Sequence, residues 1–222
     1  VYTRLRRAQG GLGGLSEYFV PAGSGEAEFV EKRSSFLGHV RFAGTEDAAR
    51  EFINEMKKKH YDARHNCWCY IIREGAVRYS DDGEPQGTAG LPMLEVFRRE
   101  GVENVVCVVT RYFGGVLLGT GGLLRAYTKS AKDALDAAGI AAVRRWVKLE
   151  TACPYSLLER MKTECLALDG AVENIEYGAD VRLTLLLPEA KAEAFCARVT
   201  ELSAGQSRAQ TVGEELMPVR VR

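Results

Sequence analysis

The chain has 222 residues, of which 46% are hydrophobic and 27% are charged. This composition is that of an ordinary globular protein and excludes a disordered or fibrous chain. Thirty basic residues cancel thirty acidic ones, and the signs also balance on each side of Val143, so neither half binds nucleic acid through bulk charge. Contact with RNA would need a local basic patch.

No segment of the sequence predicts export or membrane insertion. Apolar stretches such as residues 105–109 and 183–187, the second interrupted by Thr184, are far shorter than the roughly 18 residues that span a bilayer. Arginines near the N-terminus lead into glycines rather than an apolar signal core. We therefore expect a cytoplasmic protein with buried, reduced thiols, no disulfides and no structural zinc. Its cysteines are Cys67, Cys69, Cys107, Cys153, Cys165 and Cys196.

The first 142 residues predict a domain of mixed strands and helices. In chain order we expect a flexible extension at 1–15, strands at 26–33 and 35–42, a helix capped by Thr45, a hairpin at 67–72 and 76–80, a helix from Pro92 to Gly101, a strand at 104–110 and a helix ending at Gly139. Between Asn104 and Thr110, apolar residues occupy odd-numbered and even-numbered positions alike, so both faces of the strand are apolar. This pattern indicates a central strand covered on both faces. The last helix is predicted to bury Leu124, Tyr127, Ala131, Ala134, Leu135 and Ala138.

Beyond Val143 the pattern changes to strand, helix, strand, strand, helix, strand. The predicted ranges are 145–152, 155–168, 171–177, 180–187, 189–203 and 209–217. This βαββαβ order is that of the ferredoxin-like split unit. The sequence thus predicts an α+β protein with one domain at 16–142 and a separable ferredoxin-like domain at 143–222.

Three motifs lie between residues 79 and 129. They read Ser-Asp-Asp-Gly-Glu-Pro at 80–85, Gly-Thr-Ala-Gly at 87–90 and Thr-Arg-Tyr-Phe-Gly-Gly at 110–115. With these blocks in this order, the chain resembles the IMPACT/YigZ family, of the bacterial two-domain type. The resemblance implies an N-terminal domain similar to the second domain of small-subunit ribosomal protein five, and a C-terminal domain similar to the last domain of elongation factor G. Gln86 and Leu91 depart from the pattern, and the absence of a cation at position 91 weakens an anion site beside Pro92.

Asp81, Asp82 and Glu84 place three carboxylates in one turn. Such a cluster is suited to hold a hard cation or to supply a general base. Asp, Gly and Pro are also the residues that a tight turn needs for its backbone geometry, and side-chain bonds to the backbone would account for them without chemistry. Both interpretations remain open at this point.

Glycines precede the helix that begins near residue 123, and two arginines flank them. Backbone N–H groups at Gly119, Gly121 and Gly122 would converge at the positive end of that helix and suit a phosphate. Arg111 at the strand exit and Arg125 off the apolar stripe would add guanidinium groups. The alternative is that the glycines only permit positive φ and close packing. The block is neither a Walker loop nor a dinucleotide fingerprint.

A second polar cluster contains Arg64 and His65. A Cys-x-Cys pair on a strand lacks the chelating turn of a zinc site, and no third group orients a Cys67–His65 pair for nucleophilic attack. We expect Arg64 and His65 to form a rim beside the acidic turn. Tyr112 and Trp68 are either base-stacking or core side chains. Thr88 of the Gly-Thr-Ala-Gly block completes the candidate binding residues.

These features favour a binding or regulatory protein associated with translation, with RNA, the ribosome or a translation-associated protein as partner. No catalytic residue, metal or cofactor is predicted. The alternatives are an enzyme acting on a phosphorylated or nucleotide-like small molecule, and a protein–protein adaptor. The acidic turn, Arg111 and the helix start are expected to form one pocket. Substitution of Arg111 or Arg125 by alanine should then weaken ligand binding and change stability by no more than about 0.5 kcal/mol.

Overall fold

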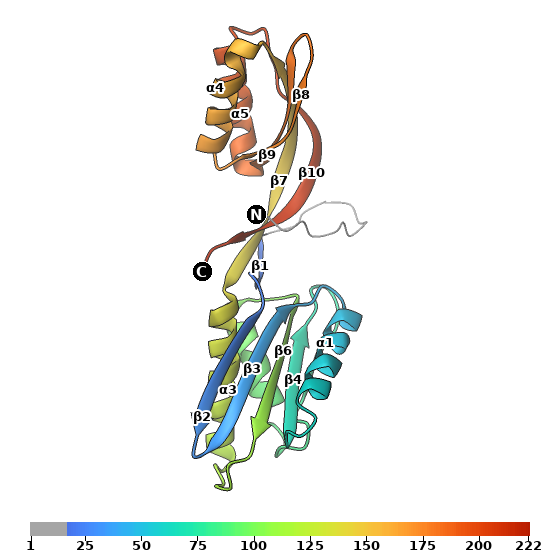
Figure 1. Ribbon diagram of the computed structural model, residues 1–222, viewed down its shortest axis with the longest axis vertical. Coiled ribbons are helices and arrows are strands. Elements are labelled where there is room, and N and C mark those ends of the chain that lie inside the picture. Colours follow the sequence, from blue (N-terminus) through green and yellow to red (C-terminus); the bar gives the residue numbers. More distant parts are fainter. Residues whose placement is uncertain (1–16) are drawn as a thin grey trace. The chain divides into compact units, whose positions relative to one another are not determined.

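The computed structural model describes residues 17–222, so the extension expected at residues 1–15 lies outside the described part. The chain forms two compact units. One contains Tyr18–Ala142 with Pro218–Arg222, and the other contains Val143–Met217 (Figure 1). Both combine strands with helices, which confirms the α+β class. Among the described helices, none is long and apolar enough to cross a membrane.

An antiparallel five-stranded sheet forms the centre of the N-terminal unit. Its order is β2 (Gly25–Glu31), β3 (Ser34–Phe42), β6 (Val105–Tyr112), β4 (His65–Ile71) and β5 (Val77–Ser80). β6 occupies the middle, and its residues from Val105 to Arg111 are all buried. The prediction of a central strand covered on both faces is therefore confirmed. The sequence did not indicate the short strand β1 (Tyr18–Pro21).

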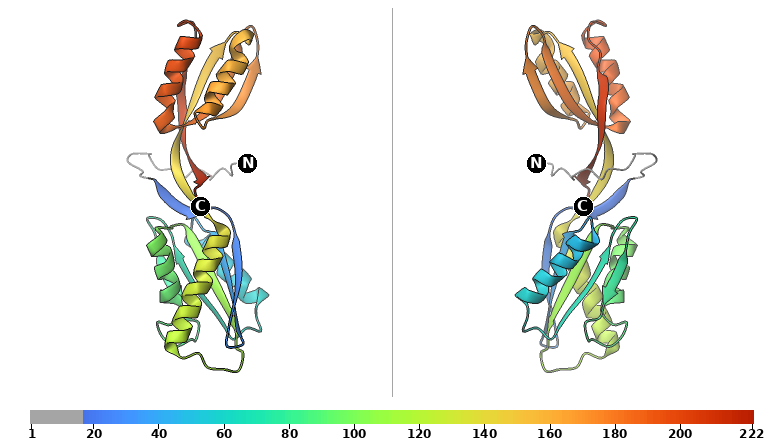
Figure 2. Two further views of the ribbon diagram at one scale, coloured as in Figure 1. Left: turned by 90° about the vertical axis from the view of Figure 1, so that its left-hand side faces the viewer. Right: turned by 90° about the vertical axis from the view of Figure 1, so that its right-hand side faces the viewer.

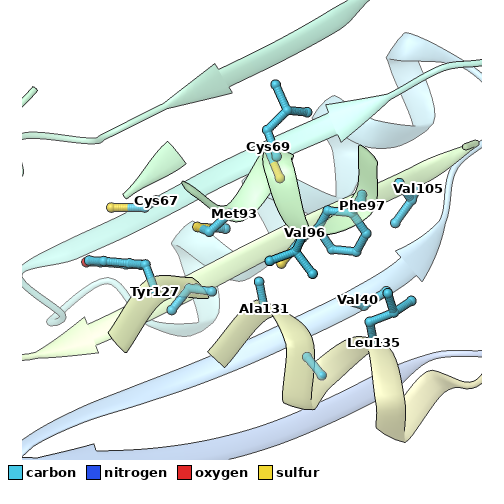
Figure 3. Packing of buried hydrophobic residues seen from close by; sticks show 14 of the residues in the cluster. Val40, Cys67, Cys69, Met93, Val96, Phe97, Val105, Tyr127, Ala131 and Leu135 are labelled. Atoms are coloured by element: carbon cyan, nitrogen blue, oxygen red, sulfur yellow. The ribbon is translucent and has the colours of Figure 1, made fainter. Parts of the chain in front are cut away.

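Helices cover both faces of this sheet. α1 (Glu46–Lys59) lies on one face, and α2 (Gly90–Glu100) and α3 (Thr120–Ala138) lie on the other (Figure 2). Figure 3 shows side chains of α2 and α3 packed against those of β3, β4 and β6. α1 ends, and α2 and α3 begin, at the same end of the sheet. This is the end where β3 begins and β6 finishes (Figure 1).

Local signals place the helix boundaries close to the predicted ones. The Thr45 side chain accepts from the backbone N–H of Ala48 at 3.2 Å, which confirms the predicted cap of α1. α2 ends at Gly101, whose φ of 66° is left-handed. The predicted stripe of α3 is wrong at one position: Leu123 is buried, whereas Leu124 is 46% exposed. Both precede Tyr127 by about one turn, so helical spacing alone does not decide which of them faces the core.

The second unit has the ferredoxin-like topology that the sequence predicts. Its elements are β7 (Ile140–Cys153), a 3₁₀ turn (Tyr155–Leu157), α4 (Leu158–Ala167), β8 (Ala171–Tyr177), β9 (Val181–Pro188), α5 (Glu189–Leu202) and β10 (Gln210–Arg220). The strands pair in the order β10–β7–β9–β8, with β1 also paired to β7, so β7 and β8 are separated by β9, as in a split βαβ unit. Both helices contribute to one core, through Met161 and Cys165 of α4 and Phe195 and Val199 of α5.

The border between the units falls inside β7 rather than in a connecting segment. α3 ends at Ala138, and the strand begins two residues later. Pro218–Arg222 belong with the N-terminal unit, although the sequence assigned them to the second domain. The backbone N–H of Ile140 donates to the carbonyl of Arg222 at 2.8 Å, and that of Val221 donates to the carbonyl of Ile140 at 2.8 Å. This pairing accounts for the difference.

We predict that a fragment comprising residues 143–217 folds without the rest of the chain. It contains its own hydrophobic core and, of the five strands in its sheet, all but β1, with β7 and β10 shortened by three residues each. The expected result is a helix-and-strand circular dichroism spectrum and one cooperative urea transition. An unfolded fragment beside a folded intact chain would contradict the independence of this unit.

Candidate functional site

The first carboxylate of the acidic turn caps α2. One oxygen of Asp81 accepts from the backbone N–H groups of Ala89 at 3.0 Å and Gly90 at 2.8 Å, and the other accepts from Gly87 at 2.8 Å. Free N–H groups at a helix start need such an acceptor, and a negative charge is favoured there. Asp81 therefore supplies from a distant turn the cap that α2 lacks locally, since its own N-cap residue Ala89 has no side-chain acceptor.

Asp82 ties the turn to α1 and β4. Its oxygens accept from the Lys57 ammonium at 2.8 Å and from the backbone N–H of Asn66 at 2.7 Å, while its carbonyl lies 2.8 Å from Nδ1 of His65. The φ of Asp82 is 44°, a left-handed conformation that aspartate tolerates in turns. The turn is thus held at three points by residues that are distant in sequence.

Glu84 is buried and forms an ion pair with Arg111. The distance from Oε1 of Glu84 to Nη1 of Arg111 is 2.6 Å, and the side chains are 3% and 6% exposed. The Tyr127 hydroxyl of α3 donates to the same oxygen at 2.9 Å. Burial, followed by the neighbouring Cys67 and then Glu84, raises the pKa of Tyr127, so this phenol stays protonated and remains a donor.

The placement of Arg111 corrects the expectation that its substitution leaves folding nearly unchanged. Arg111 lies within β6, it is 5% exposed, and its second terminal nitrogen donates to Oγ of Ser34 at 3.4 Å. Its guanidinium also lies 5.5 Å from the ring centroids of Phe36 and Phe113. Arg111 therefore connects the acidic turn, β3 and β6 as an internal partner of Glu84.

Cys67 and His65 do not form a nucleophile and base. The Cys67 thiol donates to the carbonyl of Asp81 at 3.0 Å, and burial raises its pKa far above the ordinary value. His65 directs Nδ1 to the carbonyl of Asp82 and has Nε2 3.9 Å from Glu84. His65 therefore belongs to the acidic turn, as the sequence suggested, but as a hydrogen-bonding partner within it.

Tyr112 joins a pair of buried histidines on the α1 face. Its hydroxyl donates to Asp62 at 3.1 Å and lies 3.0 Å from Nδ1 of His60, so His60 donates from Nδ1. The rings of His39 and His60 have centroids 5.5 Å apart. Nε2 of His60 and both ring nitrogens of His39 are buried without a hydrogen-bond partner within residues 17–222. Protonation of either ring would bury a positive charge, which Glu26, with Oε1 3.4 Å from Nδ1 of His39, offsets only in part.

We predict that stability falls as the pH drops below the ordinary histidine range. Burial is the main cause that lowers the pKa of His39 and His60; Lys59 lowers both further, while Glu26 raises both and Asp62 raises that of His60. A histidine with a lowered folded pKa contributes stability above its unfolded pKa of about 6.5 and loses it as the pH falls. His39→Gln should therefore flatten the dependence of the unfolding free energy on pH between about 7 and 5.5, by at most about 1.4 kcal/mol per pH unit. Equal slopes in urea titrations of the two proteins would contradict this.

Glycines shape the loop between β6 and α3. A Cβ at Gly114 would lie 2.0 Å from the backbone of Arg33, so only glycine permits this approach to the β2–β3 turn. Gly119 has a φ of 72° and precedes α3. Gly121 and Gly122 form its first turn, and Arg125 is exposed beside Gly121. The structure therefore shows the close packing and the positive φ that glycine permits, and phosphate binding by the first N–H groups of α3 stays a prediction.

Basic side chains gather where these loops meet. The loop-end surface, as we name it, comprises the exposed cations Lys32, Arg33, Lys58, Lys59, Arg64 and Arg125. Arg33 packs against Gly114, and the backbone N–H of Arg64 donates to the carbonyl of Arg111, which places both at the end of the sheet where β6 finishes. Within residues 17–222, no carboxylate lies within 4 Å of any of the six charged groups.

The predicted single pocket is therefore only partly formed. Asp81, Asp82, Glu84, His65 and Arg111 do converge, but mainly through bonds to the protein itself. Among the described residues, no hydrogen bond or ion pair joins Gly119–Gly122 to the acidic turn, and the Thr88 hydroxyl donates to the carbonyl of Pro85 at 2.6 Å. Arg64 and Arg125 belong instead to the loop-end surface. No group of three or more His, Cys, Asp or Glu within residues 17–222 is arranged to hold a metal ion.

Sequence reasoning missed three partners of the acidic turn: Lys57, Asn66 and Tyr127. In the sequence, Lys57 is explained by the favourable position of a cation at the C-terminal end of a helix, and Tyr127 by the apolar stripe of its helix. Neither residue therefore indicates a contact with the acidic turn. It also missed the aromatic side chains exposed at this end, Tyr61 at 85% and Phe113 at 38%. Trp68 and Tyr112 are instead half-buried.

Comparisons with known proteins agree with this architecture. Residues 32–135 match the model of the Impact N-terminal domain, and residues 151–206 match a domain of unknown function, DUF1949. The IMPACT family member YvyE of Bacillus subtilis is 38% identical over 87% of this chain and 90% of its own length. YigZ of Escherichia coli is 32% identical over 90% of this chain and its whole length. A crystal structure of a hypothetical protein has a TM-score of 0.56 and 32% identity, over 90% of this chain and 98% of its own. The chain belongs to the IMPACT family.

Proposed function

We propose that the protein is a cytoplasmic, translation-associated module that binds RNA of the ribosome through its loop-end surface. The proposal depends on one observation: six exposed cations without carboxylate partners among the described residues lie at one end of the N-terminal unit, in a chain whose net charge is zero. A local cluster of this kind is what phosphate binding requires when bulk charge is absent.

Neighbouring groups support RNA rather than an acidic protein as the ligand. Tyr61 and Phe113 expose ring surface beside the cations, and Arg64 lies 5.5 Å from the Phe113 ring centroid. Aromatic rings within a basic surface stack on unpaired bases. The first N–H groups of α3, at Gly121 and Gly122, suit a phosphate oxygen. The likeness to domains of a ribosomal protein and an elongation factor, implied by the family resemblance, favours the ribosome as the source of that RNA.

The internal contacts of the acidic turn weigh against the enzymatic alternative. Asp81 accepts from three backbone N–H groups, Asp82 pairs with Lys57, and Glu84 pairs with Arg111. A general base needs a carboxylate within hydrogen-bonding reach of a substrate. Here each carboxylate is engaged by the protein, so the turn supports the loops rather than a reaction.

We predict that the intact chain sediments with ribosomes at low salt and is released as salt is raised. The double charge reversal Arg33→Glu/Arg125→Glu should weaken binding at least tenfold, because two attractive interactions with phosphates become repulsive. The slope of log affinity against log salt should become shallower by about 0.9 for each phosphate that the variant no longer neutralises. Both residues are exposed, so folding should be unchanged in circular dichroism.

The matched control is Arg160→Glu/Arg208→Glu, which makes the same charge change on exposed residues of the second unit. It should reduce binding by much less than the loop-end variant. Equal losses would show that the loop-end surface is not the binding site. Absence of sedimentation at low salt, together with a stable protein partner in a pull-down, would favour the adaptor alternative.

A further inference from the structure

A groove of about 410 Å³ lies between α1 and the β4–β5 hairpin. This volume is within the range of small-ligand sites. α1 contributes Arg50, Ile53, Asn54 and Lys57 to the wall of the groove. These residues are three or four positions apart, so they share one helix face. The groove is thus lined on one side by a continuous, largely polar stripe.

Two aromatic rings line the opposite side. Trp68 and Tyr70 are two residues apart on β4, so they project from the same face of the sheet. Their ring centroids are 5.7 Å apart and their planes differ by only 6°. Arg78 of β5 is the direct neighbour of Tyr70 across the hairpin. A stacked indole and phenol therefore stand next to a guanidinium at the wall of the groove.

Charge in the groove is positive. Arg50 and the Tyr70 hydroxyl both donate to Glu46, and these bonds lower the pKa of this carboxyl, so it stays ionised. Lys57 pairs with Asp82 and retains further N–H donors. Arg78 donates to the carbonyl of its neighbour Val77, and no carboxylate lies within 4 Å of its guanidinium among residues 17–222. Three cations thus face the groove and only two are paired, which leaves it suited to an anion.

We propose that this groove binds a nucleotide unit, with its base against Trp68 and its phosphate at Arg78, Arg50 and Lys57. A planar heteroaromatic ring joined to a phosphate is the chemistry that an aromatic wall beside guanidinium groups recognises. Asn54 supplies an amide that can donate to and accept from a base edge. Free nucleotides and nucleotides within RNA share this chemistry.

The site lies beside α1 and uses none of the loop-end cations, so nucleotide binding can be tested separately from the proposed ribosome binding. Nucleotide binding and ribosome sedimentation are separate measurements, and either can fail without the other. If the ligand is a nucleotide within RNA, the groove extends the loop-end surface, because Lys57 belongs to the last turn of α1, next to Lys58 and Lys59.

The test uses the fluorescence of Trp68 in the intact chain. The protein has two tryptophans, and Trp146 is 3% exposed in the second unit, so quenching by an added base reports Trp68. Adenosine monophosphate, adenosine, inorganic phosphate and a six-residue oligoadenylate are titrated with excitation at the red edge of the indole absorption. We expect saturable quenching by the monophosphate or the oligonucleotide and at least tenfold weaker binding of adenosine. Inorganic phosphate should compete without quenching.

Arg78→Gln should weaken nucleotide binding about tenfold, and Trp68→Leu should weaken it at least fivefold in a competition assay with a labelled nucleotide. Arg99→Gln, an exposed arginine of α2 on the opposite face, is the matched control and should change nothing. Tighter binding of the oligonucleotide than of the monophosphate assigns the site to RNA, and the reverse order assigns it to free nucleotides. Absence of saturable quenching by either, or equal affinities in Arg78→Gln and the unchanged protein, overturns the proposal.

Discussion

Replacement of Arg111 by alanine is expected to lower the unfolding free energy of the N-terminal unit by about 3–5 kcal/mol. The change removes the guanidinium from the buried carboxylate of Glu84; the Tyr127 hydroxyl still donates to it, and Nε2 of His65 lies 3.9 Å away. An unpaired charge costs far more inside a protein than an intact ion pair stabilises it. Urea denaturation in a Trp146→Phe background, where Trp68 is the remaining tryptophan, measures this loss by fluorescence in the unit that contains the pair.

Two further variants separate the buried pair from a general effect of losing an arginine. Arg125→Ala, at an exposed position of α3, should change the unfolding free energy by no more than about 0.5 kcal/mol. Glu84→Gln/Arg111→Met should be less destabilised than Arg111→Ala alone, because no buried charge remains. If Arg111→Ala is as stable as Arg125→Ala, the ion pair does not hold the turn in solution.

The elements of the fold could be predicted because their signals are local. Strand β6 has apolar residues on both faces, and the Thr45 cap is followed by apolar residues at helical spacing. The second unit has complete amphipathic elements in the order of a known fold. Strand β1 has only four residues, too few for periodicity to appear. The pairing of Ile140 with Arg222 joins residues far apart in the chain, and no local pattern carries that information.

The candidate site was predicted less completely because its contacts are long-range. The motifs marked the acidic turn and Arg111 correctly as neighbours, yet an arginine at the end of a strand gives no sign of burial until its partner is known. Glu84 lies 27 residues earlier in the chain, and Tyr127 reaches the same oxygen from α3. Because these partners are distant in sequence, the sequence alone could not distinguish a structural role of Arg111 from a ligand-binding role.

This division of roles explains how charged residues are distributed in the N-terminal unit. Charges of the acidic turn are buried or paired and fix the positions of α2, α3 and β6. Six cations without carboxylate partners among the described residues lie outside this framework at the loop-end surface, and Arg78 is another such cation. Binding groups supported by rigid elements lose less conformational entropy when a ligand orders them. We therefore interpret the acidic turn and Arg111 as the rigid support of the proposed binding surfaces.

Asp81→Ala is expected to lower the unfolding free energy by about 2–4 kcal/mol, because three N–H groups at the start of α2 lose a charged acceptor. Asp81→Asn should cost about half as much. Its oxygen can still accept from Ala89 and Gly90, but its amide N–H₂ would face the donor at Gly87.

Asp47→Ala, in the exposed first turn of α1, is the matched control and should cost less than about 1 kcal/mol, since it removes only a helix-dipole contact. Urea denaturation measures all three variants. Equal costs for Asp81→Ala and Asp47→Ala would mean that water replaces the cap, and that the acidic turn does not hold α2 in place.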